Sequence, residues 1–485
     1  MKKILFYMYM SCFIFLFSTM ILSQEPDRSR PPKLPGPKPL QLPQIQHFEL
    51  SNGLKVILME KHEVPLVQLN VLVKAGTVND QEDKEGLANL TLDMMDEGAA
   101  GKSSLEISDA IDFLGAEIST RAGLHYSEVD LHTPLSKFDE ALKIMSDIIL
   151  HPDFPQNELG RKKKERLTLI TQWHDNPSSI AGIAFNKYLY GDHHPYGKMY
   201  TGSEESINSF STGDLKKFYN EYFKSNNAFV IAVGDIRKDE LNNKLENAFG
   251  KWQSGNAEET IIKDPAQVQK RIIYLIDKPG SAQSVIYIGK VGAKRLTPDY
   301  NSIIVMNTIL GGSFSSRLND NLREQHGYTY GAGSRFRFGP IPGSFIAYSS
   351  VQTEVTDKAL AEFFKEFERI REPIPDEEVS RGKNLVALSY PADFQSVSNI
   401  ARQLEDLAEY NLPSNYFDNY INDILNVKDD EVHAAAEKYI VPDKMIVIIV
   451  GDRTKIEDGI KALNLGEINN LSIEDVLGKI PSVED

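Results

Sequence analysis

Two stretches of this chain follow the same strand pattern, and this duplication limits the folds that the chain can adopt. FVIAVGDI (229–236) and KMIVIIVGDR (444–453) both run through β-branched and apolar residues into Val-Gly-Asp. Runs of this kind are typical of strands that are buried on both faces. Each follows a Tyr-rich helix end and a short polar turn, which indicates a repeated unit of about 200 residues. We therefore expect an α+β fold made of two homologous α/β sandwich halves.

Local patterns predict further elements in both halves. HFELSNGLKVILMEK (47–61) predicts a hairpin with Asn52-Gly53 at its turn, because this dipeptide tolerates the positive φ angles of tight hairpins. VPLVQLNVLVKAG (64–76) predicts a long strand, and apolar residues at helical spacing then predict a helix capped by Gly98. In the second half, two strand-like runs precede a predicted helix at 300–312.

Composition divides the chain into five segments. Two lysines followed by an apolar run to Leu22 are typical of a signal peptide over residues 1–23. An uncleaved anchor is the alternative, because the run is long enough to span a bilayer. Proline-rich residues 24–45 predict an extended linker. We expect the first half at 46–250, a connecting segment at 251–270 and the second half at 271–480.

Charge and cysteine content bear on the compartment and on the ligand. The formal net charge of −16 argues against nucleic-acid binding, which needs a basic face. The single cysteine, Cys12, lies inside the apolar run, so the cleaved protein would contain no disulfide. A core of this size does not need one. We expect an exported protein, periplasmic or extracellular, that does not contact the membrane after signal cleavage.

The segment LGGSFSSRLNDNLREQHGYTYGA (310–332) contains the residues with the clearest chemical potential. The pattern predicts a helix from Ser315 to about Gln325, then a glycine-broken turn and a strand. Arg323 and Tyr330 then lie near the helix end, where a guanidinium and a phenol can bind a peptide carbonyl or a developing oxyanion. The alternative is that Arg323 pairs with Glu324 or Asp320 on a solvated helix and that Tyr330 is a half-buried strand residue.

The same segment resembles the C-terminal half of the insulinase/pitrilysin metallopeptidases, the inverzincins. The resemblance extends over about residues 46–480 and implies a clamshell like that of the mitochondrial processing peptidase, in which two halves enclose a peptide chamber. In that family an Arg and a Tyr in an LRE…G-x-x-Y context help to bind substrate. The resemblance therefore assigns a substrate-binding role to Arg323 and Tyr330.

The zinc motif of that family, H-x-x-E-H, is absent from this chain. The matching segment runs from Glu85 to Gly98 and has Asn89 and Asp93 at the two histidine positions and Leu92 at the position of the glutamate base. The third ligand of the family is a glutamate six residues before the Asp of a D-x-P, which gives Leu169 here. The resemblance thus implies no metal and no catalytic residue in this chain. It also implies that restoring the motif alone would fail for want of a ligand at Leu169.

Two functions remain open at this point. The first is a non-zinc subunit of an exported heteromeric metallopeptidase, inactive alone, whose homologous partner supplies the zinc while this chain binds the peptide substrate. The second is a catalytically inactive peptide-binding or scaffold protein of the same fold. The retention of both Arg323 and Tyr330 in full motif context favours the first function.

Overall fold

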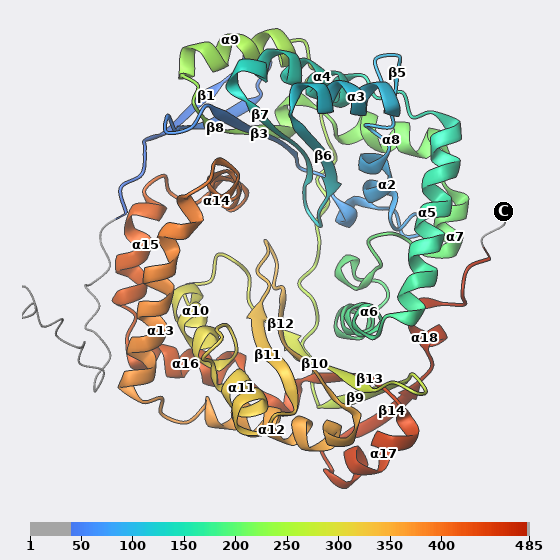
Figure 1. The fold of residues 1–485 in the computed structure, drawn as a ribbon, viewed down its shortest axis with the longest axis vertical. Helices are drawn as coiled ribbons and strands as arrows, with labels where there is room; N and C mark the ends of the chain where they lie inside the picture. Colours follow the sequence, from blue (N-terminus) through green and yellow to red (C-terminus); the bar gives the residue numbers. More distant parts are fainter. Residues whose placement is uncertain (1–39, 483–485) are drawn as a thin grey trace, which may run out of the picture. The chain divides into compact units, whose positions relative to one another are not determined.

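The computed structural model describes residues 40–482, and the predicted signal peptide and most of the proline-rich segment lie outside that range. Two six-stranded sheets form the framework, one in each half (Figure 1). The first sheet contains β1 (Ile45–Glu49), β2 (Lys55–Glu60), β3 (Leu66–Val73), β6 (Glu117–Ala122), β7 (Ser127–Pro134) and β8 (Ala228–Gly234). The second contains β9 (Ile272–Asp277), β10 (Gln283–Val291), β11 (Thr329–Phe336), β12 (Ser344–Gln352), β13 (Ile446–Gly451) and β14 (Glu467–Leu471).

The two sheets repeat one topology. Their strand orders are β1-β2-β8-β3-β7-β6 and β14-β9-β13-β10-β12-β11. In both, the second and third strands of this order run parallel and the remaining pairs toward β6 or β11 are antiparallel. Both Val-Gly-Asp sequences end equivalent strands, β8 and β13. The outer strands β1 and β14 differ in direction, because β1 comes from an N-terminal hairpin and β14 from the C-terminal end. The expected fold of two similar α/β halves is confirmed.

Helices follow the strands in both halves. Those of the first half are α2 (Leu87–Asp93), α3 (Ser104–Leu114), α4 (Phe138–Leu150), α5 (Gln156–Asp175), α6 (Pro177–Tyr190), α7 (Glu204–Ser209), α8 (Thr212–Tyr222) and α9 (Lys238–Phe249). Those of the second half are α10 (Tyr300–Leu310), α11 (Arg317–Asn319), the π-helix η5 (Asp320–Gln325), α12 (Thr356–Arg369), α13 (Asp376–Ser389), α14 (Val397–Glu409), α15 (Tyr416–Leu425), α16 (Asp429–Tyr439), α17 (Arg453–Ala462) and α18 (Ile473–Leu477). No helix among residues 40–482 is long and apolar enough to cross a membrane.

Each half places one helix on the sheet of the other half. Helix α6 of the first half packs on β10 and β13, and helix α14 of the second half packs on β3 and β8 (Figure 1). Buried residues of α6, including Phe185, share one hydrophobic cluster with Ile448 of β13. Leu404 of α14 shares the other cluster with Ile231 of β8. Each of the two hydrophobic clusters therefore contains residues of both halves, and the face between the halves is built from both.

Most local expectations agree with the structure, and two need correction. The hairpin at 47–61 forms as β1 and β2, and Gly53 has the positive φ of 85° that its turn requires. The helix expected to reach Gly98 ends at Asp93, and Gly98 belongs to the short strand β4 (Gly98–Ala99) paired with β5 (Lys102–Ser103). The single helix expected at 315–325 is the three-residue α11 followed by the π-helix.

Candidate functional site

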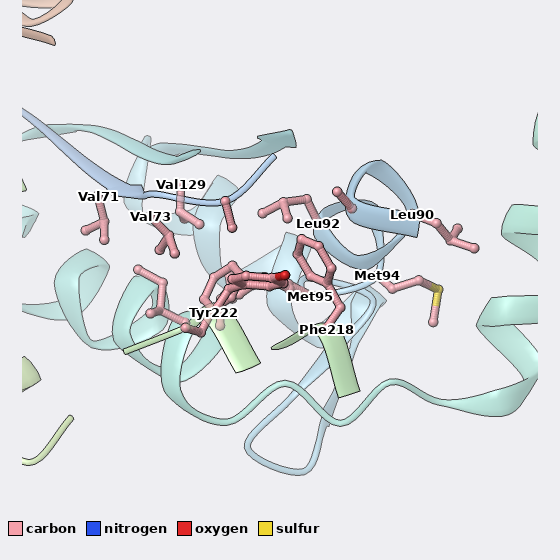
Figure 2. Packing of buried hydrophobic residues seen from close by; sticks show 14 of the residues in the cluster. Val71, Val73, Leu90, Leu92, Met94, Met95, Val129, Phe218 and Tyr222 are labelled. Carbon is pink, nitrogen blue, oxygen red and sulfur yellow. The ribbon is translucent and has the colours of Figure 1, made fainter. Parts of the chain in front are cut away.

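Helix α2 carries Asn89, Leu92 and Asp93, the positions that the resemblance assigns to the zinc motif. Both carboxylate oxygens of Asp80 accept hydrogen bonds from the start of α2, from the amides of Gly86 (2.7 Å) and Ala88 (2.8 Å). Burial raises the pKa of Asp80 to about 7. The inward face of α2 packs into the core of the first half, where Leu92 is fully buried near Met95 and Phe218 (Figure 2). Asn89 and Asp93 lie on the remaining, half-buried face of the helix.

A buried arginine fills the space between Asn89 and Asp93. Nη2 of Arg166, on α5, donates to Oδ1 of Asn89 (2.6 Å) and to Oδ2 of Asp93 (2.5 Å). Nη1 donates to the carbonyl oxygen of Thr201 (3.0 Å). The Arg166 side chain is only 5% exposed, and burial lowers the pKa of its guanidinium. The pair on α2 is thus bound to a cation supplied by the protein itself.

These side chains do not fit zinc. Zinc sites in proteins are formed by imidazole, thiolate and carboxylate ligands in tetrahedral geometry. Here an amide, one carboxylate and a guanidinium that stays protonated converge, and the guanidinium would repel a metal ion. The chemistry of this site is that of a structural ion pair.

The structure brings Arg166, and not Leu169, to the α2 pair. Leu169 lies one helical turn further along α5, is half-buried and packs against the core of the first half. Arg166 follows a basic run that contains Arg161 and Lys162, and such runs are usually solvated, yet Arg166 is buried. The available signal was its place directly before the apolar Leu167, at the point where the polar part of α5 ends.

Arg323 lies on the π-helix, with its guanidinium 4.5 Å from the centre of the Phe314 ring. Its Nη1 is 3.4 Å from Oε1 of Glu324. The ion pair with Glu324 that the alternative interpretation of Arg323 predicted is therefore present. Asn321 anchors the π-helix by donating to Glu366, a fully buried carboxylate, over 2.8 Å. Short π-helical turns occur often at functional sites, where they change the direction of a side chain.

Tyr330 lies on β11, the edge strand of the second sheet, where the register shifts between Thr329 and Ala332. Its side chain is 92% exposed, so the expectation of a half-buried strand residue is wrong. A bulge at a sheet edge redirects a side chain away from the pleat, which accounts for this exposure. The phenol is therefore available to another molecule.

Two adjoining cavities lie between the halves. Their volumes are about 480 and 340 Å³, and both are lined by Asn186, Lys198, Tyr200 and Arg337. The first half contributes α6 to both cavities and the loop between β6 and β7 to the larger one. The second half contributes the end of β11 to the smaller cavity, and α14 and the segment just after β11 to the larger one. Arg323, Tyr330, Asn89 and Asp93 do not line either cavity. Sequence reasoning missed this groove, because its residues come from segments far apart in the chain.

Three carboxylates meet beside the larger cavity, and two of them, Glu128 and Glu405, line it. Oxygens of Glu128 and Asp130 on β7 and of Glu405 on α14 lie within 4.8 Å of one another. Arg121 donates from Nε to Glu128 over 2.7 Å, and Asn70 donates to Glu405. Burial, with the neighbouring Glu128 second, raises the pKa of both Asp130 and Glu405 to about 8. The raised pKa values favour shared protons in this cluster, whereas the bound guanidinium of Arg121 acts in the opposite direction.

Comparison with known proteins identifies the family. Residues 55–193 match the family model described as insulinase, peptidase family M16, and residues 209–386 match the model described as the peptidase M16 inactive domain. The chain belongs to the insulinase-type M16 peptidase family. The resemblance drawn from the sequence is confirmed, and within this family the chain is a homologue without an H-x-x-E-H motif.

Similar proteins occur in several bacteria. The non-peptidase homolog YmxG of Helicobacter pylori is 22% identical over 422 residues, which span 86% of this chain and 96% of that protein. The uncharacterized zinc protease YmxG of Bacillus subtilis is 25% identical over 286 residues, or 59% of this chain and 68% of that protein. A peptidase M16 inactive domain from Pseudomonas fluorescens superposes with a TM-score of 0.79 at 28% identity and spans 84% of this chain and 98% of that one.

Proposed function

We propose that this chain is the non-zinc subunit of an exported two-chain metallopeptidase. It binds the peptide substrate through Arg323 and Tyr330, while a homologous partner chain holds the zinc. The observation that carries the proposal is a contrast between two sites of the family. The metal site is filled by Arg166, whereas the side chain of Tyr330 is almost fully exposed.

The replaced metal site supports a role without catalysis by this chain. The polar groups of Asn89 and Asp93 are hydrogen-bonded to Arg166. Leu92, at the position of the general base, is fully buried in the core, whereas a general base would have to be accessible to the substrate. A scaffold that had lost all function would not need an almost fully exposed phenol on an edge strand. The polar pair is therefore the part of the site that this chain contributes.

The chemistry of the pair suits peptide binding. The guanidinium of Arg323, held over the Phe314 ring, can donate two hydrogen bonds to a peptide carbonyl. The hydroxyl of Tyr330 can donate to the peptide backbone or to an oxyanion that forms during hydrolysis. Zinc in the partner would supply the Lewis acid for hydrolysis, and this chain orients the substrate.

Reconstitution of the pair tests the proposal. The full chain is used as bait in its native source, and any co-purifying homologue with H-x-x-E-H is expressed with it. We expect each chain alone to leave a quenched fluorescent peptide library intact and the mixture to cleave it. Cleavage by the zinc-bearing partner alone at the full rate would contradict the proposal.

A second function has support from one relative. The Helicobacter pylori protein that matches almost the whole chain carries the name non-peptidase homolog. This supports a peptide-binding or scaffold protein that assembles without proteolysis. Peptide binding by the isolated chain, with no partner bearing H-x-x-E-H recovered and no gain of peptidase activity in any mixture, would favour this function.

A further inference from the structure

We propose that the smaller cavity between α6 and β11 binds a carboxylate group of the peptide, held by Arg335, Arg337 and Lys198. That the ligand is a peptide rests on the proposed function. The inference adds that the groove selects a peptide with a carboxylate group. The observation behind it is the charge of the cavity wall. Fourteen residues line the cavity, and three of them are cations while none is an aspartate or glutamate.

The two arginines lie side by side on the edge strand. Arg335 and Arg337 are two residues apart on and just after β11, so they point to the same side of the sheet. Neither makes an ion pair with any of the residues 40–482, although the chain has a net charge of −16. The two guanidinium groups are exposed and have no carboxylate partner among the described residues, and Arg335 lies 5.3 Å from the centre of the Tyr348 ring.

Lys198 adds a third charge from the first half. Its Nζ donates to the carbonyl oxygen of Glu82 over 3.1 Å, and its charge also interacts with the carboxyl groups of Asp80 and Glu85 without a direct ion pair. The cations therefore come from both halves and converge on one space of about 340 Å³. A cavity of this size accommodates one or two side chains of an extended peptide.

The chemistry of the wall selects a carboxylate. A planar guanidinium matches a carboxylate in two parallel hydrogen bonds, and two adjacent arginines hold it more firmly than a lysine alone. Ser179 on α6 and Tyr287 on β10 offer neutral hydroxyl groups in the same wall. An acidic side chain and a C-terminal carboxylate have the same chemistry, so the experiment has to separate these two sources.

The adjoining cavity limits where the acidic group can lie. Glu405, Asp406 and Glu409 on α14 line the larger cavity, which joins the smaller one at Arg337. These carboxyl groups repel a second acidic residue at that end once they ionise above their raised pKa values. The groove is therefore expected to prefer peptides with a local acidic group over uniformly acidic ones.

Three fluorescein-labelled twelve-residue peptides test the inference by fluorescence anisotropy with the full chain. All have the same Ala, Ser and Leu background. The first has a central Glu-Glu and an amidated C-terminus, the second a central Gln-Gln and an amidated C-terminus, and the third a central Gln-Gln and a free C-terminus. We expect the first or the third to bind about 10-fold tighter than the second, and the advantage to shrink at high salt.

Paired variants connect the effect to the cavity. Arg335→Gln/Arg337→Gln should remove the 10-fold advantage of the carboxylate peptide and leave binding of the uncharged peptide unchanged. Arg381→Gln/Arg453→Gln, which removes two arginines from α13 and α17 outside both cavities, should retain the advantage. Arg337→Lys keeps the charge without the fork and should give an intermediate value.

The possible outcomes separate the inference from the proposed function. Equal affinity for all three peptides overturns the carboxylate site and leaves peptide binding intact. An advantage that survives in Arg335→Gln/Arg337→Gln with an unchanged circular dichroism spectrum also overturns it. Binding of no peptide at all counts against peptide binding by this chain, and the inference falls with it.

Discussion

Arg166 and Asp93 form an ion pair in which the arginine is almost fully buried and the aspartate is one-third exposed. Nη2 of Arg166 lies 2.5 Å from Oδ2 of Asp93, and the same nitrogen donates to Asn89. The pair joins α5 to α2 at the place where members of this family with H-x-x-E-H bind zinc. An ion pair between side chains thus joins the two helices at the positions that the resemblance assigns to zinc ligands.

Removing Arg166 should destabilise the first half. Arg166→Ala leaves Asp93 and Asn89 without their partner and opens space in a buried region, so we expect a loss of about 2–4 kcal/mol in the free energy of unfolding. Lys164→Ala, on an exposed turn of the same helix, should change it by less than about 0.5 kcal/mol. Urea unfolding followed by circular dichroism measures both, and equal losses would show that the ion pair contributes nothing.

Zinc binding should require replacement of Arg166 and not of Leu169. Asn89→His/Asp93→His should bind no zinc, because the guanidinium remains in the site. Adding Arg166→Glu completes two imidazoles and one carboxylate, and we expect about one zinc per chain by elemental analysis. Adding Leu169→Glu instead should bind none. Tight zinc binding by Asn89→His/Asp93→His/Leu169→Glu, with Arg166 retained, would show that Leu169 and not Arg166 faces the α2 pair.

Leu92→Glu should be poorly tolerated in any of these variants. Leu92 is fully buried beside Phe218, and an unpaired carboxylate there would have to stay protonated or unfold the region (Figure 2). We expect a loss of about 3 kcal/mol or more in the free energy of unfolding, and no peptidase activity from the rebuilt motif. The isosteric Leu92→Met serves as the control and should cost less than about 1.5 kcal/mol.

Substitutions of Arg323 and Tyr330 in the second half should affect catalysis and not folding. In a reconstituted complex, Arg323→Ala and Tyr330→Phe should each lower kcat/KM by about 10²–10³, as expected for the loss of a donor to the reacting peptide. Arg323→Lys should also be poor, because a point charge cannot replace the planar fork. Assembly is checked by size-exclusion chromatography. Wild-type turnover from both variants in an intact complex would leave a scaffold role.

Stability should fall as pH rises because of the carboxylate cluster. Aspartate and glutamate titrate near pH 4 in an unfolded chain, whereas burial raises the pKa of Asp130 and Glu405 to about 8. Between about pH 4 and 8 the folded state binds more protons than the unfolded state, so the free energy of unfolding decreases with pH.

The variant Glu405→Gln should weaken that dependence. It keeps the shape and cannot ionise, so its free energy of unfolding should fall less than that of the wild type between about pH 5 and 8. The exposed Glu437→Gln should behave like the wild type. Identical pH profiles for Glu405→Gln and the wild type, measured by urea unfolding, would mean that the cluster is ionised throughout.

The sequence predicted the parts of this protein that depend on neighbours in the chain. Alternating and continuous apolar runs predicted β2, β8 and β13, and Asn52-Gly53 predicted the turn before β2, because strand and turn preferences are local. The repeated Val-Gly-Asp predicted two equivalent halves. The absence of H-x-x-E-H was also visible in the sequence, because a motif of this kind is recognised from residue types and their spacing alone.

The tertiary structure decided which side chains meet. Arg166 and Asn89 are 77 residues apart, and a shift of one helical turn on α5 exchanges Arg166 for Leu169. The basic residues of α5 have the same charge in the sequence, but burial by α2 selects Arg166. Helices α6 and α14 pack on the opposite half, which no periodicity reveals, because an apolar face does not say which sheet covers it. The cationic wall of Lys198, Arg335 and Arg337 forms only because the two halves pack against each other in this way.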